Sequence, residues 1–295
     1  MREYKYEAPT SLEELFILLK DRGDEETRVV AGGTDFVPKL SEELDSIPAE
    51  EKKPLNIVYL GKLGLDQIKA EGQTVSIGAL CTLNGIKDNP VIKEKLPVLT
   101  ETIAEIAGMA VRNTATIGGN IMNASPAADS APTLIALDAK FVLKSGEGER
   151  EIDAKDFFTG PGKTKAGKNE ILTEVKIKAG EGSAAFVKLG RRKAETLSVA
   201  NAAVNVFISG GVCEKVNIAV GSVGPTVIKC GEAEKMLLGK KPTAEAIAEA
   251  ARKVADEISP IDDIRGSAWY RRKVTPVLVE RALKKAAGLQ EGVKH

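Results

Sequence analysis

Two pairs of adjacent glycines are the residues in this chain whose type and spacing could do chemistry. The first lies in Val29-Val30-Ala31-Gly32-Gly33-Thr34-Asp35-Phe36, and the second lies in Thr116-Ile117-Gly118-Gly119-Asn120. Glycine lets a backbone adopt positive φ and approach a ligand closely, and successive amides in such turns form concave anion sites. Two such turns could hold a pyrophosphate between them without Lys or Arg. Taken alone, either pair can also be interpreted as an ordinary tight turn without a ligand.

Histidine and cysteine chemistry is nearly excluded by the composition. The one histidine is His295 at the last position, and chain termini are usually frayed, so neither Ser-His-Asp or Cys-His catalysis nor a His-rich metal site is expected. Cys81, Cys213 and Cys230 are odd in number and far apart in the sequence. They predict buried free thiols in a reducing cytoplasm rather than a disulfide framework.

The charge balance argues against a nucleic-acid partner. The 295 residues carry 42 basic and 42 acidic side chains, so there is no basic footprint for a polyanion. The aromatic side chains (7 Phe, 4 Tyr and 1 Trp) offer few stacking platforms for bases. No stretch approaches the ~20 apolar residues of a membrane helix, and the charged start Met1-Arg2-Glu3 has no apolar secretory segment. We therefore expect a cytoplasmic protein without membrane insertion.

One further motif nearly matches a nucleoside-triphosphate loop. Residues 162–169 read GKTKAGKN, but the last position is Asn169 where Ser or Thr would reach magnesium. The sequence after it, residues 171–177, has the pattern of a strand and not of the required helix. A triphosphate site is therefore not expected there. A Rossmann NAD site is not supported either, because no G-x-G-x-x-G occurs in a strand-turn-helix context.

The elements around the first glycine pair predict a small α+β unit over residues 1–60. Ser11 and Glu14 have the spacing of a capping box at the start of a helix. Leu15, Leu18 and Leu19 supply the buried stripe of that helix. A short strand over residues 28–31 runs directly into Gly32, and residues 56–60 form a second strand.

The rest of the chain divides near residue 180, where Ala179-Gly180-Glu181-Gly182 indicates a boundary. Between residues 61 and 178, strands and helices alternate: a strand at 73–79, helix over much of 91–110, an apolar run at 131–137, and strands near 141–143 and 171–177. Beyond the boundary we expect strands at 185–189, 202–208 and 216–220, with Gly210-Gly211 as a hairpin turn between the last two. Helices are expected at 244–258 and 268–287, the second kinked or started by Pro276.

The second glycine segment and the run ASPAADSAP at 124–132 closely resemble the FAD-binding medium subunit of the molybdenum hydroxylases. This family includes xanthine dehydrogenase, aldehyde oxidase and aerobic carbon monoxide dehydrogenase. Residues 30–35 resemble its first FAD loop, and residues 157–164 its linker before the strand at 170–172. Residues 186–192 and 258–267 are similar to its C-terminal domain. The resemblance spans nearly the whole chain, with the motifs in the same order.

The resemblance implies an α+β fold. It implies a two-part FAD-binding domain of the vanillyl-alcohol-oxidase (PCMH) type, with one subdomain at 1–60 and the other at 61–178. A C-terminal flavoprotein domain at 179–295 would follow, built from a three-stranded antiparallel sheet with helices.

The resemblance also implies roles for single residues. Ile106 and Ala107 would pack against the flavin, Leu172 would touch the cofactor from a strand, and Lys188 would lie near the flavin edge. Asp129 would accept hydrogen bonds from the ribityl or ribose region. Without the resemblance, Ile106, Ala107 and Leu172 are ordinary core residues, Asp129 is a helix cap and Lys188 is a solvated strand residue. The pyrophosphate and ribityl would be wrapped by the two glycine segments: Val29, Val30, Ala31, Gly32, Gly33, Thr34, Asp35, Phe36, Thr116, Ile117, Gly118, Gly119 and Asn120.

Three departures from the family narrow what the resemblance implies. Many relatives carry an acidic residue near Thr196, so tuning of the flavin from that position is not expected here. The branch that reduces hydroxybenzoyl thioesters has a cysteine-rich insert for an extra iron–sulfur cluster, which three scattered cysteines cannot supply. Covalent attachment of FAD through histidine is excluded by the position of His295.

The expected function is that of the FAD-carrying subunit of a multisubunit molybdenum hydroxylase. It would take electrons from [2Fe-2S] clusters in a small subunit and pass them to an acceptor such as NAD+, while a large subunit holds molybdopterin. The flavin would supply the redox chemistry, so no catalytic side chain of the chain's own is expected. Two alternatives stay open. A free-standing flavin reductase of the same fold would need an acid beside the flavin that we do not identify. A non-catalytic assembly protein is disfavoured by the intact glycine segments.

Overall fold

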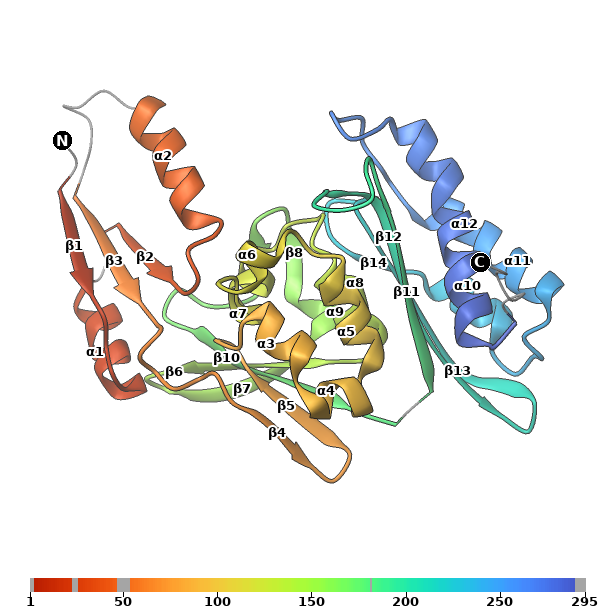
Figure 1. The fold of residues 1–295 in the computed structure, drawn as a ribbon, viewed down its shortest axis with the longest axis horizontal. Coiled ribbons are helices and arrows are strands. Elements are labelled where there is room, and N and C mark those ends of the chain that lie inside the picture. The colour runs from red at the N-terminus through yellow and green to blue at the C-terminus, as the bar shows by residue number, and fades with distance from the viewer. Residues whose placement is uncertain (1–2, 23–25, 47–53, 181, 290–295) are drawn as a thin grey trace.

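The computed structural model describes residues 3–22, 26–46, 54–180 and 182–289. His295, Met1 and Arg2, which entered the sequence-based expectations, lie outside these ranges. The chain runs along an elongated molecule, from the N-terminal elements at one end to the C-terminal helices at the other (Figure 1). None of the helices in the described ranges is long and apolar enough to cross a membrane.

The N-terminal part is a three-stranded parallel sheet with two helices. Its strands are β1 (Tyr4–Glu7), β3 (Leu55–Tyr59) and β2 (Thr27–Val30) in that order, joined by α1 (Leu12–Arg22) and α2 (Phe36–Ser46). The predicted Ser11 cap at the start of α1 is confirmed, because the Ser11 hydroxyl accepts from the Glu14 amide at 3.1 Å. The Glu14 carboxylate reaches back to the amide of Thr10, one residue earlier than the usual box. Leu15 and Leu19 are buried, and Leu18 is half-buried beside them.

The middle part is an antiparallel five-stranded sheet covered by short helices. The strand order is β4 (Ile68–Glu71), β5 (Thr74–Gly78), β10 (Ile171–Lys178), β6 (Lys140–Ser145) and β7 (Gly148–Asp153). The region predicted as largely helical over 91–110 is so, in three helices that are separated at Leu96 and at 105–108. The helices are α3 (Leu83–Asp88), α4 (Pro90–Lys95), α5 (Pro97–Ala104), α6 (Met109–Arg112), α7 (Ile117–Met122), α8 (Ser130–Ala136) and α9 (Ala154–Phe157), with a small ribbon of β8 (Phe158–Gly160) and β9 (Lys163–Thr164).

The C-terminal part is an antiparallel sheet backed by helices on one face (Figure 1). Three long strands lie close to their predicted places, but the sheet has a fourth strand of two residues that the sequence did not signal. Pro276 lies inside the last helix, which begins behind the N-cap Ser267, so the expectation that Pro276 starts it is wrong. The elements are β11 (Ser183–Gly190), β12 (Ser198–Ser209), β13 (Val212–Gly221), β14 (Ile228–Lys229), α10 (Gly231–Leu237), α11 (Ala244–Glu257) and α12 (Ala268–Ala286).

Helix α8 joins the middle part to the C-terminal sheet. All seven of its residues are buried, and it packs against β12 and β13. Just past its end, Asp138 accepts from Asn217 at 2.7 Å and lies 2.9 Å from the Lys215 ammonium. Burial raises the pKa of Asp138, but the hydrogen bonds from Lys215 and Asn217 outweigh it and leave that pKa below its ordinary value. The carboxylate therefore stays ionised at the junction.

Candidate cofactor site

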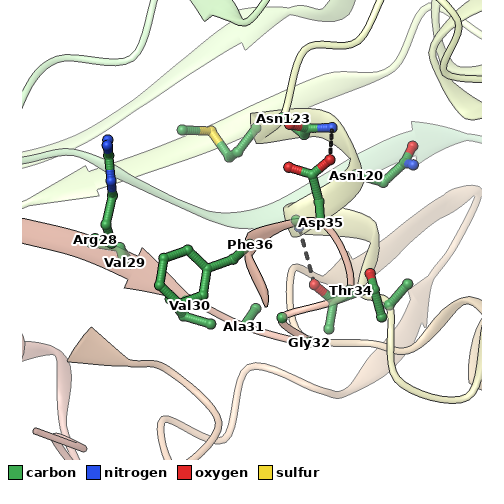
Figure 2. A pocket seen from close by; sticks show the side chains of 15 residues that line it. Arg28, Val29, Val30, Ala31, Gly32, Thr34, Asp35, Phe36, Asn120 and Asn123 are labelled. Atoms are coloured by element: carbon green, nitrogen blue, oxygen red, sulfur yellow. Dashed lines mark hydrogen bonds between the residues drawn. The ribbon is translucent and has the colours of Figure 1, made fainter. Parts of the chain in front are cut away.

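The first glycine pair forms a tight turn between β2 and α2. Gly33 has φ of +70°, which glycine adopts without strain. A Cβ atom on Gly32 would lie 2.0 Å from the backbone oxygen of Thr114, so only glycine fits where the turn packs against the residues just before the second glycine segment. After the turn, Asp35 pairs with Lys39 at 2.6 Å. It also accepts from the Asn123 side chain at 3.2 Å (Figure 2). These contacts bring two segments that are far apart in sequence together.

The second glycine pair is not the predicted turn but the first turn of helix α7. Thr116 is its N-cap, and the Thr116 hydroxyl accepts from the Gly119 amide at 3.0 Å. Gly118 packs against β5's end, because its amide donates to the Ala79 carbonyl at 2.8 Å and a Cβ would lie 2.7 Å from the Ala79 side chain. Gly119 is exposed, and the one atom that an added Cβ would meet within 4 Å is the Thr116 hydroxyl. Gly118 thus allows the helix to pack closely against Ala79, whereas Gly119 leaves open space.

A cavity of about 400 Å³ opens between the two glycine segments (Figure 2). It is lined by Val29 to Phe36 without a break and by Thr116, Gly119 and Asn120 of the predicted set. The predicted residues Ile117 and Gly118 are buried and do not reach it. Four lining residues were not predicted: Arg28, Ala115, Met122 and Asn123. We call this space the first cavity.

A second cavity of about 270 Å³ adjoins the first and is more apolar. The two share Val29, Ala31, Gly119 and Met122 in their linings. The second cavity adds Gly118 and the predicted Leu172, together with a set of aliphatic side chains. That set is Leu60, Ala79, Leu80, Ala166 and Ile171. A flat or apolar group could enter here while a polar group occupies the first cavity.

The segment that mimics a triphosphate loop lies at the rim of the second cavity. Thr164, Gly167 and Lys168 line it, and β10 rather than a helix follows, as the sequence indicated. Two hydrogen bonds of 2.7 Å from Arg150 to Glu170 hold the pKa of Glu170 below its ordinary value, so the rim keeps an ionised carboxylate. This segment is therefore not a triphosphate loop, but it still lines the second cavity.

Four predicted residues lie in a separate group that lines neither cavity. Lys188 of β11 is buried, with its side chain 4% exposed, so the alternative of a solvated strand residue is wrong. Its ammonium lies 2.7 Å from the Asp129 carboxylate and donates to the Glu105 carbonyl at 2.6 Å. Ile106 and Ala107 follow that carbonyl directly.

Asp129 is buried and accepts three hydrogen bonds from residues of the C-terminal sheet. Its Oδ1 accepts from the Ser198 hydroxyl at 2.5 Å and from the Asn201 amide at 2.8 Å, and its Oδ2 accepts from Lys188. Asp129 stands at the N-cap position of α8 but makes no side-chain capping bond, so the alternative role as a helix cap is wrong. A carboxylate has about four lone-pair sites, so Oδ2 keeps room for one more donor.

Family models match the chain in two consecutive pieces. A model described as the FAD binding domain in molybdopterin dehydrogenase matches residues 2–177, and one described as the CO dehydrogenase flavoprotein C-terminal domain matches residues 185–286. The chain is 35% identical over 286 residues to a glyceraldehyde dehydrogenase medium chain from Sulfolobus acidocaldarius, covering 97% of this chain and 99% of that one. It is 32% identical to a carbon monoxide dehydrogenase medium chain from Hydrogenophaga pseudoflava, with 96% of each chain covered.

Solved structures agree with these matches along the whole chain. Carbon monoxide dehydrogenase from Hydrogenophaga pseudoflava contains a chain that superposes with a TM-score of 0.91 at 32% identity, covering 98% of this chain and 99% of that one. A chain of quinoline 2-oxidoreductase from Pseudomonas putida 86 gives a TM-score of 0.88 at 29% identity, with 98% of each chain covered.

Proposed function

Because this chain belongs to the FAD-binding medium-chain subunits of the molybdenum hydroxylase family, we propose that it carries electrons between subunits and an external acceptor. FAD is its cofactor, and the chain is a subunit of an oxidoreductase. In the proposal, electrons arrive from [2Fe-2S] clusters of a small partner subunit and leave to an acceptor such as NAD+. A large partner subunit would hold molybdopterin and hydroxylate the substrate.

One observation carries the cofactor assignment: both glycine segments line one cavity, and glycine leaves that cavity open. Gly119 lines both cavities, and an added Cβ there would have only the Thr116 hydroxyl beside it. The first cavity suits a pyrophosphate and ribityl, because glycine backbone, the threonines Thr34 and Thr116, and the amide side chains of Asn120 and Asn123 are in its lining together with Arg28. The Asp35 carboxylate and several apolar side chains also line it, and that carboxylate is paired with Lys39. The second cavity suits an adenine, because it is apolar and next to the first. The residues present therefore fit FAD.

The remaining predicted residues are assigned to the flavin end of the cofactor. We place Ile106 and Ala107 against the flavin, with Lys188 beside it and Asp129 accepting one cofactor hydroxyl at the open site of its Oδ2. Bound FAD supplies the redox chemistry. The chain's own work is to bind and orient the cofactor, exclude water and keep a fixed charge beside it.

The finer description of the fold belongs to the same proposal. We assign the N-terminal and middle parts to a PCMH-type FAD-binding domain with subdomains at 1–60 and 61–178, and residues 179–295 to the flavoprotein domain. The family models support the boundary near residue 180, because one ends at residue 177 and the other begins at residue 185.

Co-purification and reoxidation kinetics test the proposed electron path. A tagged full-length chain, expressed with its neighbouring reading frames, should retain an iron–sulfur subunit and a molybdopterin subunit. Reduction of the complex by dithionite, followed by mixing with NAD+, should restore the oxidised flavin spectrum faster than buffer does. A chain that binds FAD but purifies alone under all conditions would contradict the subunit role and favour a free-standing reductase.

A further inference from the structure

The connection between α5 and α6 is held by two cations through its backbone. Lys188 donates to the Glu105 carbonyl at 2.6 Å. One terminal nitrogen of Arg112 donates to the Ile106 carbonyl and to the Ala107 carbonyl, both at 2.6 Å. The three carbonyls are consecutive, and a cation is bonded to each of them. The C-terminus of a helix favours positive charge, and a cationic side chain can bond to its last carbonyls. Here two cations, each buried or half-buried, bond to three consecutive carbonyls, which is more than an ordinary helix end has.

The connection needs holding because its conformation is unfavourable. Ala107 has φ of +44°, in the left-handed region that costs free energy for any residue with a Cβ. Strained backbone of this kind persists where the surroundings over-determine it, and it gathers at ligand clamps. The next residue is Gly108, and the Glu195 carboxylate lies where a Cβ on it would go. Hydrogen bonds from Lys188 and Arg112 hold the connection.

Both cations are themselves anchored. The Arg112 Nε donates to the Asn84 side chain at 3.2 Å, which ties the guanidinium to α3. Lys188 is tied to Asp129, which is in turn held by Ser198 and Asn201 of the C-terminal sheet. Each cation is therefore held by a second element besides the connection: Arg112 by α3, and Lys188 by Asp129.

We propose that Arg112 is a positioning residue for the cofactor and that it works with Lys188 to fix the connection at Glu105–Gly108. The inference rests on the proposed function, because it takes Ile106 and Ala107 as the flavin contacts. Arg112 bonds to backbone carbonyls of these two residues and acts on the cofactor through them. Its planar fork serves two carbonyls and Asn84 at once, a task that the single head of lysine performs less well.

The test compares the full-length chain with Arg112→Ala, Arg112→Lys and a matched control. Arg272→Ala is the control, because Arg272 also donates to a backbone carbonyl, that of Ala255, between the C-terminal helices. FAD affinity is measured by titration, and backbone hydrogen exchange of residues 105–109 is measured without cofactor. We expect Arg112→Ala to weaken FAD binding at least tenfold and to speed that exchange at least tenfold. Arg112→Lys should fall between it and the wild type, and Arg272→Ala should change neither quantity.

The outcomes separate this inference from the proposed function. A wild-type chain that does not bind FAD defeats the proposed function itself. A wild type that binds FAD, with Arg112→Ala equal to it in affinity, flavin absorption spectrum and exchange, overturns the positioning role alone. If Arg112→Ala lowers the thermal stability but leaves FAD affinity unchanged at temperatures below unfolding, then Arg112 has only a structural role. That result also overturns the positioning role. If Arg112→Ala does not fold, Arg112→Lys decides by the same two readouts.

Discussion

The ammonium of Lys188 lies 2.7 Å from the carboxylate of Asp129, although the two residues are 59 positions apart and belong to different parts of the fold. Their side chains are 4% and 7% exposed, so each charge depends on the other. The pair joins β11 of the C-terminal sheet to the start of α8. Through Lys188 it also reaches the Glu105 carbonyl, next to the residues assigned to the flavin.

Asp129→Asn should destabilise the chain strongly. Removing one partner of a buried pair leaves the other charge uncompensated, which costs about 3–5 kcal/mol. The free energy of unfolding, measured by urea titration, should fall by that amount. Asp256→Asn is the control, because Asp256 is 69% exposed in its pair with Lys253 and such pairs contribute about 0.2–1 kcal/mol. Equal losses in the two variants would show that the Asp129 pair is no more than a surface contact.

Gly32→Ala should destabilise the junction of the two glycine segments. The added methyl would lie 2.0 Å from the Thr114 backbone oxygen, and backbone cannot move aside as a flexible side chain does. Overpacking of this kind costs about 1–3 kcal/mol, and the displaced turn should also weaken FAD binding. Gly231→Ala is the matched control, since an added Cβ there meets nothing within 4 Å. A Gly32→Ala chain as stable as the control would mean that the turn relaxes freely.

Stability should fall in acid partly through Asp263. Hydrogen bonds from Arg265, with a further one from the buried Arg271, hold the pKa of Asp263 well below its ordinary value. A carboxyl with a lowered folded-state pKa adds stability above its unfolded pKa of about 3.9, and this is lost as pH falls through the folded value. Asp263→Asn should therefore be less stable than wild type at neutral pH. The difference between the two urea midpoints should begin to shrink below about pH 5 and should still be shrinking at about pH 2; parallel curves would contradict this role.

The three cysteines should be unreactive in the native chain. All are free and buried, and burial raises the pKa of the Cys81 thiol to about 11. Burial raises the pKa of Cys213 and Cys230 as well. Because the thiolate is the reacting form, Ellman's reagent at pH 8 should label the native protein slowly and all three thiols after unfolding. Rapid labelling of one equivalent in the native state would contradict the burial of that cysteine.

Local signals in the sequence were enough to predict the elements whose causes are local. The Ser11 cap, the strand that ends at Val30 and the turn at Gly33 follow from residues within a few positions of one another. Gly118-Gly119 was expected to form a turn, because glycine has low helix propensity. The pair is instead helical, because the Thr116 side chain caps a helix that starts there.

Long-range partners could not be predicted in the same way. Lys188 looks solvated in its strand, and only the distant Asp129 makes it a buried ion. Arg112 shows no local pattern, since its role depends on where the backbone at Ile106 and Ala107 turns. The two-residue strand β14 is too short for any periodicity to appear.

Equilibrium titration of the chain with FAD tests the central claim most directly when it is done on wild type and Gly119→Leu together. The claim is that FAD occupies the space between the two glycine segments, which Gly119 lines and which a leucine there would fill. We predict one FAD per wild-type chain, no detectable binding by Gly119→Leu at matched stability, and normal binding by a Gly231→Leu control. FAD binding by Gly119→Leu as tight as that of wild type, or none by a folded wild type, would contradict the account.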